Sequence, residues 1–179
     1  MSKLQVTEDQ KIAKMSCGQR SQVALGLLLA QDTDLLILDD YSMGLDAGYR
    51  RLFLDYLVDY THGVGKTIFI TSHIIQDLED FVEDCVIMDY RAVLINMPIK
   101  KFRQEFRHYS FKTTNSGLKI DKNSLVRNFE IMRNNASIFS FSTAQDVEDY
   151  LISQNIPYSE FAEVPMTLED AFVGITGRY

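Results

Sequence analysis

Three side chains that could take part in phosphate chemistry stand directly after two short apolar runs. Asp39 and Asp40 follow LLIL at residues 35–38, and His73 follows TIFITS at residues 67–72. A carboxylate can bind Mg²⁺, often together with water, and phosphoryl transfer needs a group that orients the attacking water. Polar residues are common after strands, but two acids and a histidine at two adjacent strand ends exceed that ordinary expectation.

The apolar runs predict two strands with a helix between them. LLIL and TIFITS are continuously apolar, as strands buried on both faces of a sheet are, and residues 47–61 have the leucine spacing of a helix. A strand–helix–strand order predicts parallel neighbours joined by a right-handed crossover. Ligands of such sheets bind beyond the carboxyl ends of the strands, so we expect Asp39, Asp40 and His73 to lie together there.

The segment GVGKT at residues 63–67 has the look of a phosphate-binding loop but does not fit its full pattern. That pattern needs a glycine five residues before Gly65, where this chain has Tyr60. The segment also enters a strand instead of opening a helix, so it offers no helix N-terminus to a phosphate. We expect Gly63 and Gly65 to end the preceding helix and turn the chain into the sheet.

The remaining elements before residue 108 follow from capping residues and apolar spacing. Ser16 is a plausible N-cap for the helix that follows it. We expect the apolar face of this helix at Val23, Ala24, Leu27 and Leu28, a third helix at 74–84, two strands within 85–97 around an Asp-Tyr-Arg turn, and a short amphipathic helix after Pro98.

From about residue 108 the pattern changes to alternating apolar and polar positions. HYSFKTT and FEIMRNNASIFSFS read as strands, and a helix capped by Ser142 or Thr143 follows them. After another strand-like segment, Thr167 and Asp170 have the spacing of a capping box. We therefore predict a first domain at residues 1–107 and a small α+β domain at residues 108–179.

Composition excludes several classes of protein. The chain has 179 residues, is 46% hydrophobic and carries a formal net charge of −7, whereas nucleic-acid binders usually show a basic surface. It has no apolar run long enough to span a membrane, and its first residues are too polar for a signal peptide. The two cysteines are far apart without metal-ligand spacing. We expect a cytoplasmic protein that binds no nucleic acid and does not insert into a membrane.

Four motifs in order resemble the ATP-binding subunit of an ABC transporter. MSCGQ stands where the family has its signature sequence, LLILDD resembles the Walker B strand, GLDA the D-loop, and the histidine after TIFITS the switch histidine. TLEDAFVGITGR resembles the end of the exporter-type subfamily that works with ABC-2 permeases. The resemblance covers the whole chain but only the second half of the family's domain, since the Walker A loop and Q-loop are not found. It implies an α/β fold, a partial P-loop NTPase core with parallel strands and a signature helix.

The resemblance implies roles for the residues at the strand ends. Asp39 would hold Mg²⁺, Asp40 would polarise the attacking water, and His73 would contact the γ-phosphate of ATP.

A second set of roles concerns the dimer of ATPase subunits. Ser16, Gly18 and Gln19 would bind the nucleotide of the opposite subunit with a hydroxyl and backbone N–H groups, at a helix start that favours anions. Asp46 would bridge the two sites across the dimer. Ser16 and Asp46 could instead serve as helix caps.

Four residues depart from the family pattern. Cys17 replaces a glycine, which restricts the backbone, Met15 replaces leucine, and Tyr41 replaces proline. Asp40 stands where the family has glutamate, and its carboxylate reaches about 1–1.5 Å less far. A misplacement of about 1 Å can cost roughly a hundredfold in rate, so we expect slow hydrolysis or a differently held water.

Two functions remain open. The first is the C-terminal part of a transporter ATPase that works with a membrane permease and a second ATPase subunit, and that is peripheral to the cytoplasmic membrane; alone, this chain should not hydrolyse ATP. The second is a non-catalytic module for dimerisation or partner docking. A chromosome-maintenance or repair ATPase shares the motifs, but it should show a long coiled coil before the signature, and the acidic charge also counts against it.

Overall fold

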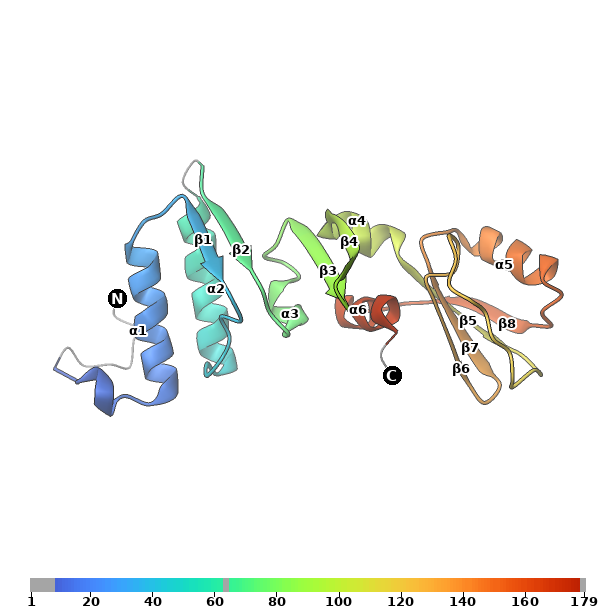
Figure 1. The fold of residues 1–179 in the computed structure, drawn as a ribbon, viewed down its shortest axis with the longest axis horizontal. Helices are drawn as coiled ribbons and strands as arrows, with labels where there is room; N and C mark the ends of the chain where they lie inside the picture. Colours follow the sequence, from blue (N-terminus) through green and yellow to red (C-terminus); the bar gives the residue numbers. More distant parts are fainter. Residues whose placement is uncertain (1–8, 63–64, 178–179) are drawn as a thin grey trace. The chain divides into compact units, whose positions relative to one another are not determined.

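The computed structural model describes residues 9–62 and 65–177 of the chain (Figure 1). It divides into two compact units, Met1–Phe81 and Val82–Tyr179. Residues 82–107 belong to the second unit, and the domain boundary predicted between residues 107 and 108 stays a prediction.

The first unit is built on two parallel strands with a helical crossover. β1 (Leu35–Leu38) pairs in parallel with β2 (Thr67–Ile70), and α2 (Ala47–Thr61) connects them (Figure 1). The register runs without interruption from the Leu35–Thr67 pair to the Leu38–Ile70 pair. The predicted parallel strand–helix–strand unit is confirmed.

Three further elements complete this unit: η1 (Ile12–Lys14), α1 (Cys17–Ala30) and α3 (Ile75–Leu78). The helix predicted over residues 74–84 is therefore wrong in length, because the observed helix has four residues. Glycine-free sequence after α3 gave no stop signal, so its apolar spacing suggested a longer helix than forms.

The apolar face predicted for α1 is also wrong. Leu25 is the buried residue of this helix, and Leu28 and Leu29 pack against the same core, whereas Leu27 is 61% exposed. VALGLLLA is apolar on almost every side. Its spacing could therefore not specify which face would meet the core of Leu36, Leu38, Phe53 and Leu57.

The expectation that both strands are buried on both faces is wrong. Leu36 and Leu38 lie in the core, but Ile37 on the other face of β1 is 63% exposed. Its partner in the register, Phe69 of β2, is 56% exposed. Successive side chains of a strand point to opposite faces, and the described helices of this unit cover only one of them.

The second unit begins with a hairpin and a short helix. β3 (Asp84–Asp89) and β4 (Ala92–Pro98) are antiparallel, and α4 (Ile99–Glu105) follows directly. Tyr90 and Arg91 both have positive φ, at 41° and 68°, as two-residue hairpin turns require. The predicted Asp-Tyr-Arg turn and the short helix after Pro98 are confirmed.

A four-stranded antiparallel sheet forms the centre of the second unit, with the order β6-β7-β5-β8. The strands of this sheet are β5 (Arg107–Lys112), β6 (Asn128–Met132), β7 (Asn135–Ser140) and β8 (Ser159–Val164). The same unit contains the helices α5 (Ala144–Ser153) and α6 (Leu168–Thr176). Thr143 and Thr167 cap α5 and α6 in complete capping boxes. The predicted α+β character and both caps are confirmed.

The two faces of this sheet have different coverings. Tyr109 and Ile138 belong to a core shared with Val147 and Leu151 of α5. Phe139 follows Ile138 in β7, so its ring lies on the opposite face, where it stacks with Phe106 at 6.3 Å. α6 approaches that ring closely: a Cβ atom built on Gly174 would lie 2.4 Å from Phe139 Cδ1.

Gly174→Ala should destabilise the second unit by about 1–3 kcal/mol, because the added methyl group must displace the Phe139 ring in a packed core. The measurement is urea unfolding followed by the NMR signals of β7. Gly26→Ala is the control, since a Cβ atom there would meet no atom within 4 Å. That substitution should stabilise α1 by about 0.5–1 kcal/mol. Equal stability of wild type and Gly174→Ala would contradict the close packing.

Candidate functional site

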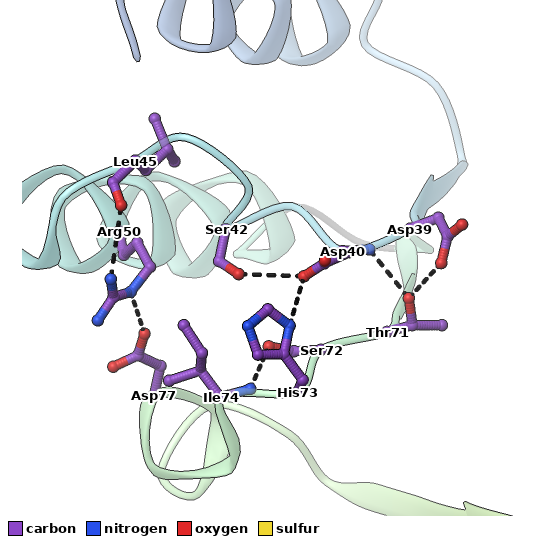
Figure 2. Close-up of polar contacts among 10 residues, drawn as sticks. All are labelled: Asp39, Asp40, Ser42, Leu45, Arg50, Thr71, Ser72, His73, Ile74 and Asp77. Atoms are coloured by element: carbon purple, nitrogen blue, oxygen red, sulfur yellow. Dashed lines mark hydrogen bonds and ion pairs between the residues drawn. The ribbon is translucent and has the colours of Figure 1, made fainter. Parts of the chain in front are cut away.

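The three predicted residues Asp39, Asp40 and His73 come together where β1 and β2 end (Figure 2). Thr71, the residue after β2, connects the two strand ends. Its hydroxyl donates to Asp39 Oδ1 at 2.5 Å and accepts from the Asp40 N–H at 2.9 Å. Its own N–H donates to the Leu38 carbonyl at 2.9 Å. Thr71 therefore ties the Asp39 carboxylate and the backbone of Asp40 to the end of the parallel ladder.

Asp40 and His73 are in direct contact. Asp40 Oδ1 lies 3.1 Å from His73 Nδ1 and accepts a hydrogen bond from the Ser42 hydroxyl, also at 3.1 Å (Figure 2). Asp40 has a positive φ of 45°, a conformation that aspartate tolerates better than most residues. The His73 side chain is 72% exposed. The prediction that these residues meet at one edge of the sheet is confirmed.

This arrangement can orient a ligand between an acid pair and a histidine. The Asp39 residue is exposed, so a hydrated cation could reach its carboxylate. Among the described residues, no group of three or more His, Cys, Asp or Glu side chains could hold a metal ion. A cation at Asp39 would thus need further ligands from water or from a bound phosphate.

The start of α1 forms a second group of predicted residues. The Ser16 hydroxyl accepts from the Gln19 N–H at 3.2 Å, and the Gln19 side chain accepts from the Ser16 N–H at 2.9 Å. This is a capping box, so the alternative role of Ser16 as a helix cap is realised.

Gly18 lets the start of α1 approach the loop after β1. A Cβ atom at Gly18 would lie 2.9 Å from the Gly44 carbonyl oxygen. Gly44 has a positive φ of 77°, and a Cβ atom there would lie 3.1 Å from Cys17 Sγ. The Ser21 hydroxyl adds a hydrogen bond to the Met43 carbonyl at 3.3 Å. The two glycines thus permit contact between these segments.

Asp46 begins α2. Its carboxylate accepts a hydrogen bond from the Tyr49 N–H at 3.0 Å, as an N-cap does. The cap role that the sequence left open is therefore present, while a role between two subunits stays a prediction.

Three relatives of this chain are ATP-binding proteins. YtrB of Bacillus subtilis, an ABC transporter ATP-binding protein, is 25% identical over 182 residues, which cover 99% of this chain and 60% of the relative. The Nod factor export ATP-binding protein I of Burkholderia orbicola is 25% identical over 181 residues, covering 99% and 58%. The taurine import ATP-binding protein TauB of Pseudomonas aeruginosa is 31% identical over 119 residues, covering 66% and 44%. The chain is related to the ATP-binding subunits of ABC transporters.

The extent of this relationship is partial. The chain spans less than two thirds of the length of each of these ABC relatives. A solved structure of a cobalt transport ATP-binding protein has a TM-score of 0.48 and 16% identity, covering 78% of this chain and 49% of that one. No protein-family model matches the chain. None of the helices that the structure describes has the length and hydrophobicity needed to cross a bilayer.

The GVGKT segment of this chain has the geometry of a connection into a strand. Gly65 has a positive φ of 87° and Thr67 begins β2, as predicted, while Gly63 lies outside the described residues. Lys66 Nζ is 2.6 Å from Asp32 Oδ1 and 4.2 Å from the centre of the Tyr60 ring. The hydrogen bond to Asp32 raises the pKa of Lys66. This lysine is held at the amino ends of the strands, opposite to the acid pair.

Tyr41, the residue directly after the acid pair, packs into the core. Its residue is 5% exposed, and its ring stacks on Phe53 with the centroids 5.7 Å apart. Burial raises the pKa of Tyr41 to about 12, and the negative charge of Asp77 adds to this. The residue that directly follows Asp40 is therefore held in the core.

Sequence reasoning missed Ser42, Thr71, Arg50 and Asp77, which all contact or support this site. Thr71 lies in the predicted strand TIFITS, where its position at the end was the available signal. Arg50 Nε lies 2.6 Å from Asp77 Oδ2. These two charges are 27 residues apart on two helices, and no sequence signal pairs them.

Proposed function

We propose that this chain forms part of the ATP-hydrolysing subunit of an ABC transporter and contributes its signature segment, Walker B strand, D-loop and switch histidine. In this proposal ATP hydrolysis energises transport of a substrate through a membrane permease. The subunit works as a dimer with a second ATPase subunit and is peripheral to the cytoplasmic membrane. The ABC-2 exporter subtype is part of the proposal and rests on TLEDAFVGITGR at the end of the chain.

One observation carries the proposal: the 3.1 Å contact between Asp40 and His73 beside Asp39, at the carboxyl ends of two parallel strands. Ligands of open α/β sheets bind at this edge. Asp39 would hold Mg²⁺ together with water and the phosphates of ATP. Bound Mg²⁺ would neutralise charge that develops on the transferred phosphoryl group. Asp40 would accept a hydrogen bond from the attacking water, with His73 beside the γ-phosphate.

The start of α1 would act on a nucleotide of the second subunit. The Ser16 hydroxyl and the N–H groups near Gly18 and Gln19 stand at the N-terminus of a 14-residue helix, where backbone dipoles favour an anion. Asp46, the N-cap of α2, would reach across the same dimer interface.

A fusion protein tests this proposal. The amino-terminal part of YtrB, up to its signature segment, is joined to this chain, because in the family that part carries the Walker A loop. We expect the fusion to hydrolyse MgATP in a phosphate-release assay, and this chain alone not to do so. A well-folded fusion that binds MgATP but hydrolyses none would contradict the assignment.

Asp40→Glu in the fusion should leave ATP turnover unchanged or raise it. Glutamate extends the carboxylate by one methylene group and restores the reach of the family residue, whose loss can cost roughly a hundredfold in rate. Asp40→Asn is the control, since asparagine also tolerates positive φ but lacks the charge. It should lower turnover strongly. If Asp40→Glu lowers turnover as Asp40→Asn does, aspartate is required at this site.

A further inference from the structure

Arg50 connects the segments that follow the two strands. Its Nε atom donates to Asp77 Oδ2 at 2.6 Å, and its Nη1 atom donates to the Leu45 carbonyl at 3.5 Å (Figure 2). Leu45 belongs to the loop after β1, which begins with the acid pair. Asp77 belongs to α3, which begins directly after His73 and Ile74. One guanidinium group therefore contacts both segments.

The Arg50–Asp77 pair is sheltered. The two side chains are 20% and 26% exposed. Burial raises the pKa of the Tyr41 hydroxyl, and the negative charge of Asp77 raises it further. Charge-assisted hydrogen bonds are stronger than hydrogen bonds between neutral groups, and those of arginine also fix the geometry of the pair. The planar arginine fork presents its donors in a fixed geometry, so it fixes the positions of the carboxylate and the carbonyl more strictly than the flexible, point-like ammonium of lysine would.

His73 has few other restraints on its position. Its ring is mostly exposed, and its contact with Asp40 spans the gap between two loops. The last hydrogen bonds between β2 and the β1 side are those of Thr71, whose N–H donates to the Leu38 carbonyl and whose hydroxyl contacts both acids, so residues 72–74 are outside the ladder. The Ser72 hydroxyl accepts from the Ile74 N–H at 3.0 Å, which shapes this segment internally but does not attach it to the loop after β1. Beyond His73, Asp77 attaches the segment to the loop after β1 through Arg50, and Leu78 and Phe81 pack against the core of the unit.

We propose that Arg50 is a positioning residue that holds His73 against Asp40 by fixing α3 to the loop after β1. Its catalytic meaning rests on the proposed function, in which Asp40 and His73 act on one nucleotide. The positional claim does not, because it concerns a contact within the nucleotide-free chain. This positioning role also explains why an arginine stands near the start of α2, four residues after Asp46.

The test measures the contact directly by NMR on the 179-residue chain without nucleotide. The ring nitrogens of His73 are observed at fixed pH, and the response is the change in their chemical shifts caused by Asp40→Asn. We expect a clear response in the wild-type background. In the Arg50→Met and Asp77→Asn backgrounds it should fall at least threefold, because α3 then loses its polar attachment to the loop after β1 and keeps only its apolar packing.

Lys66→Met is the matched control. Lys66 and Asp32 form an ion pair of the same length, 2.6 Å, in the same unit, but between the amino ends of the two strands. Loss of this pair should leave the His73 response at its wild-type size. Arg50→Lys should give an intermediate response, since lysine can pair with Asp77 but lacks the fork.

Several outcomes would overturn the proposal. These are an unchanged response in Arg50→Met, an equal loss in Lys66→Met, or no His73 response to Asp40→Asn in the wild-type background. If Arg50→Met loses the amide signals of β1 and β2, Arg50→Lys decides: a full wild-type response overturns the proposal and a reduced one supports it. Inactivity of the YtrB fusion together with the expected NMR result would refute the proposed function and leave the positioning role standing.

Discussion

His73→Ala and Asp39→Asn each abolish ATP turnover in the YtrB fusion, if the acid pair and histidine act as proposed. We expect a loss of at least about a hundredfold for each, the scale on which removal of one preorganised group lowers the rate of an electrostatically assisted reaction. Asp39→Asn removes the charge that would hold Mg²⁺. His73→Ala removes the group beside the γ-phosphate and its contact with Asp40. The measurement is steady-state phosphate release at saturating MgATP.

Two substitutions elsewhere in the same unit serve as controls. His62→Ala removes the histidine at the end of α2, and Asp34→Asn removes a carboxylate before β1, at the opposite end of the strand. Both variants should retain wild-type turnover. If His73→Ala retained more than about a third of the activity while the fusion remained folded, this histidine would not be the switch residue.

We expect the chain alone to bind MgATP very weakly or not at all. The dissociation constant should lie above about 1 mM, which corresponds to a binding free energy weaker than about 4 kcal/mol. In the family, the tightest phosphate contacts come from the Walker A backbone and its lysine. The GVGKT segment does not supply them, because Lys66 is paired with Asp32 and Thr67 enters a strand. Isothermal titration calorimetry with MgATP measures this, with the YtrB fusion as the positive control.

A dissociation constant in the low micromolar range would mean that the chain has a phosphate site of its own. Lys66→Ala would then identify the site: a loss of binding would assign it to GVGKT, and unchanged binding would exclude that segment. Arg91→Ala in the β3-β4 turn is the charge-matched control, since it removes a cation from the second unit.

The sequence by itself determined the elements and the chemistry of the candidate site. The segments LLIL, before Asp39, and TIFITS, before His73, predicted a parallel pair of strands. A βαβ connection leaves parallel strands with their carboxyl ends at one edge of the sheet. Side chains with local hydrogen-bonding geometry were equally predictable. Ser16, Thr143 and Thr167 cap their helices, because a capping box depends on residues only three positions apart.

Only the tertiary structure decided which faces are covered and which charges meet. α1 is apolar all round, so its buried face at Leu25 depends on where β1 and α2 lie and not on its own spacing. Ile37 and Phe69 are exposed because no described element of their unit packs on that face of the strands, and strand composition does not encode this. Arg50 meets Asp77 across 27 residues because the crossover returns α2 beside the end of β2. Such contacts follow from the path of the whole chain, and short-range sequence patterns do not record it.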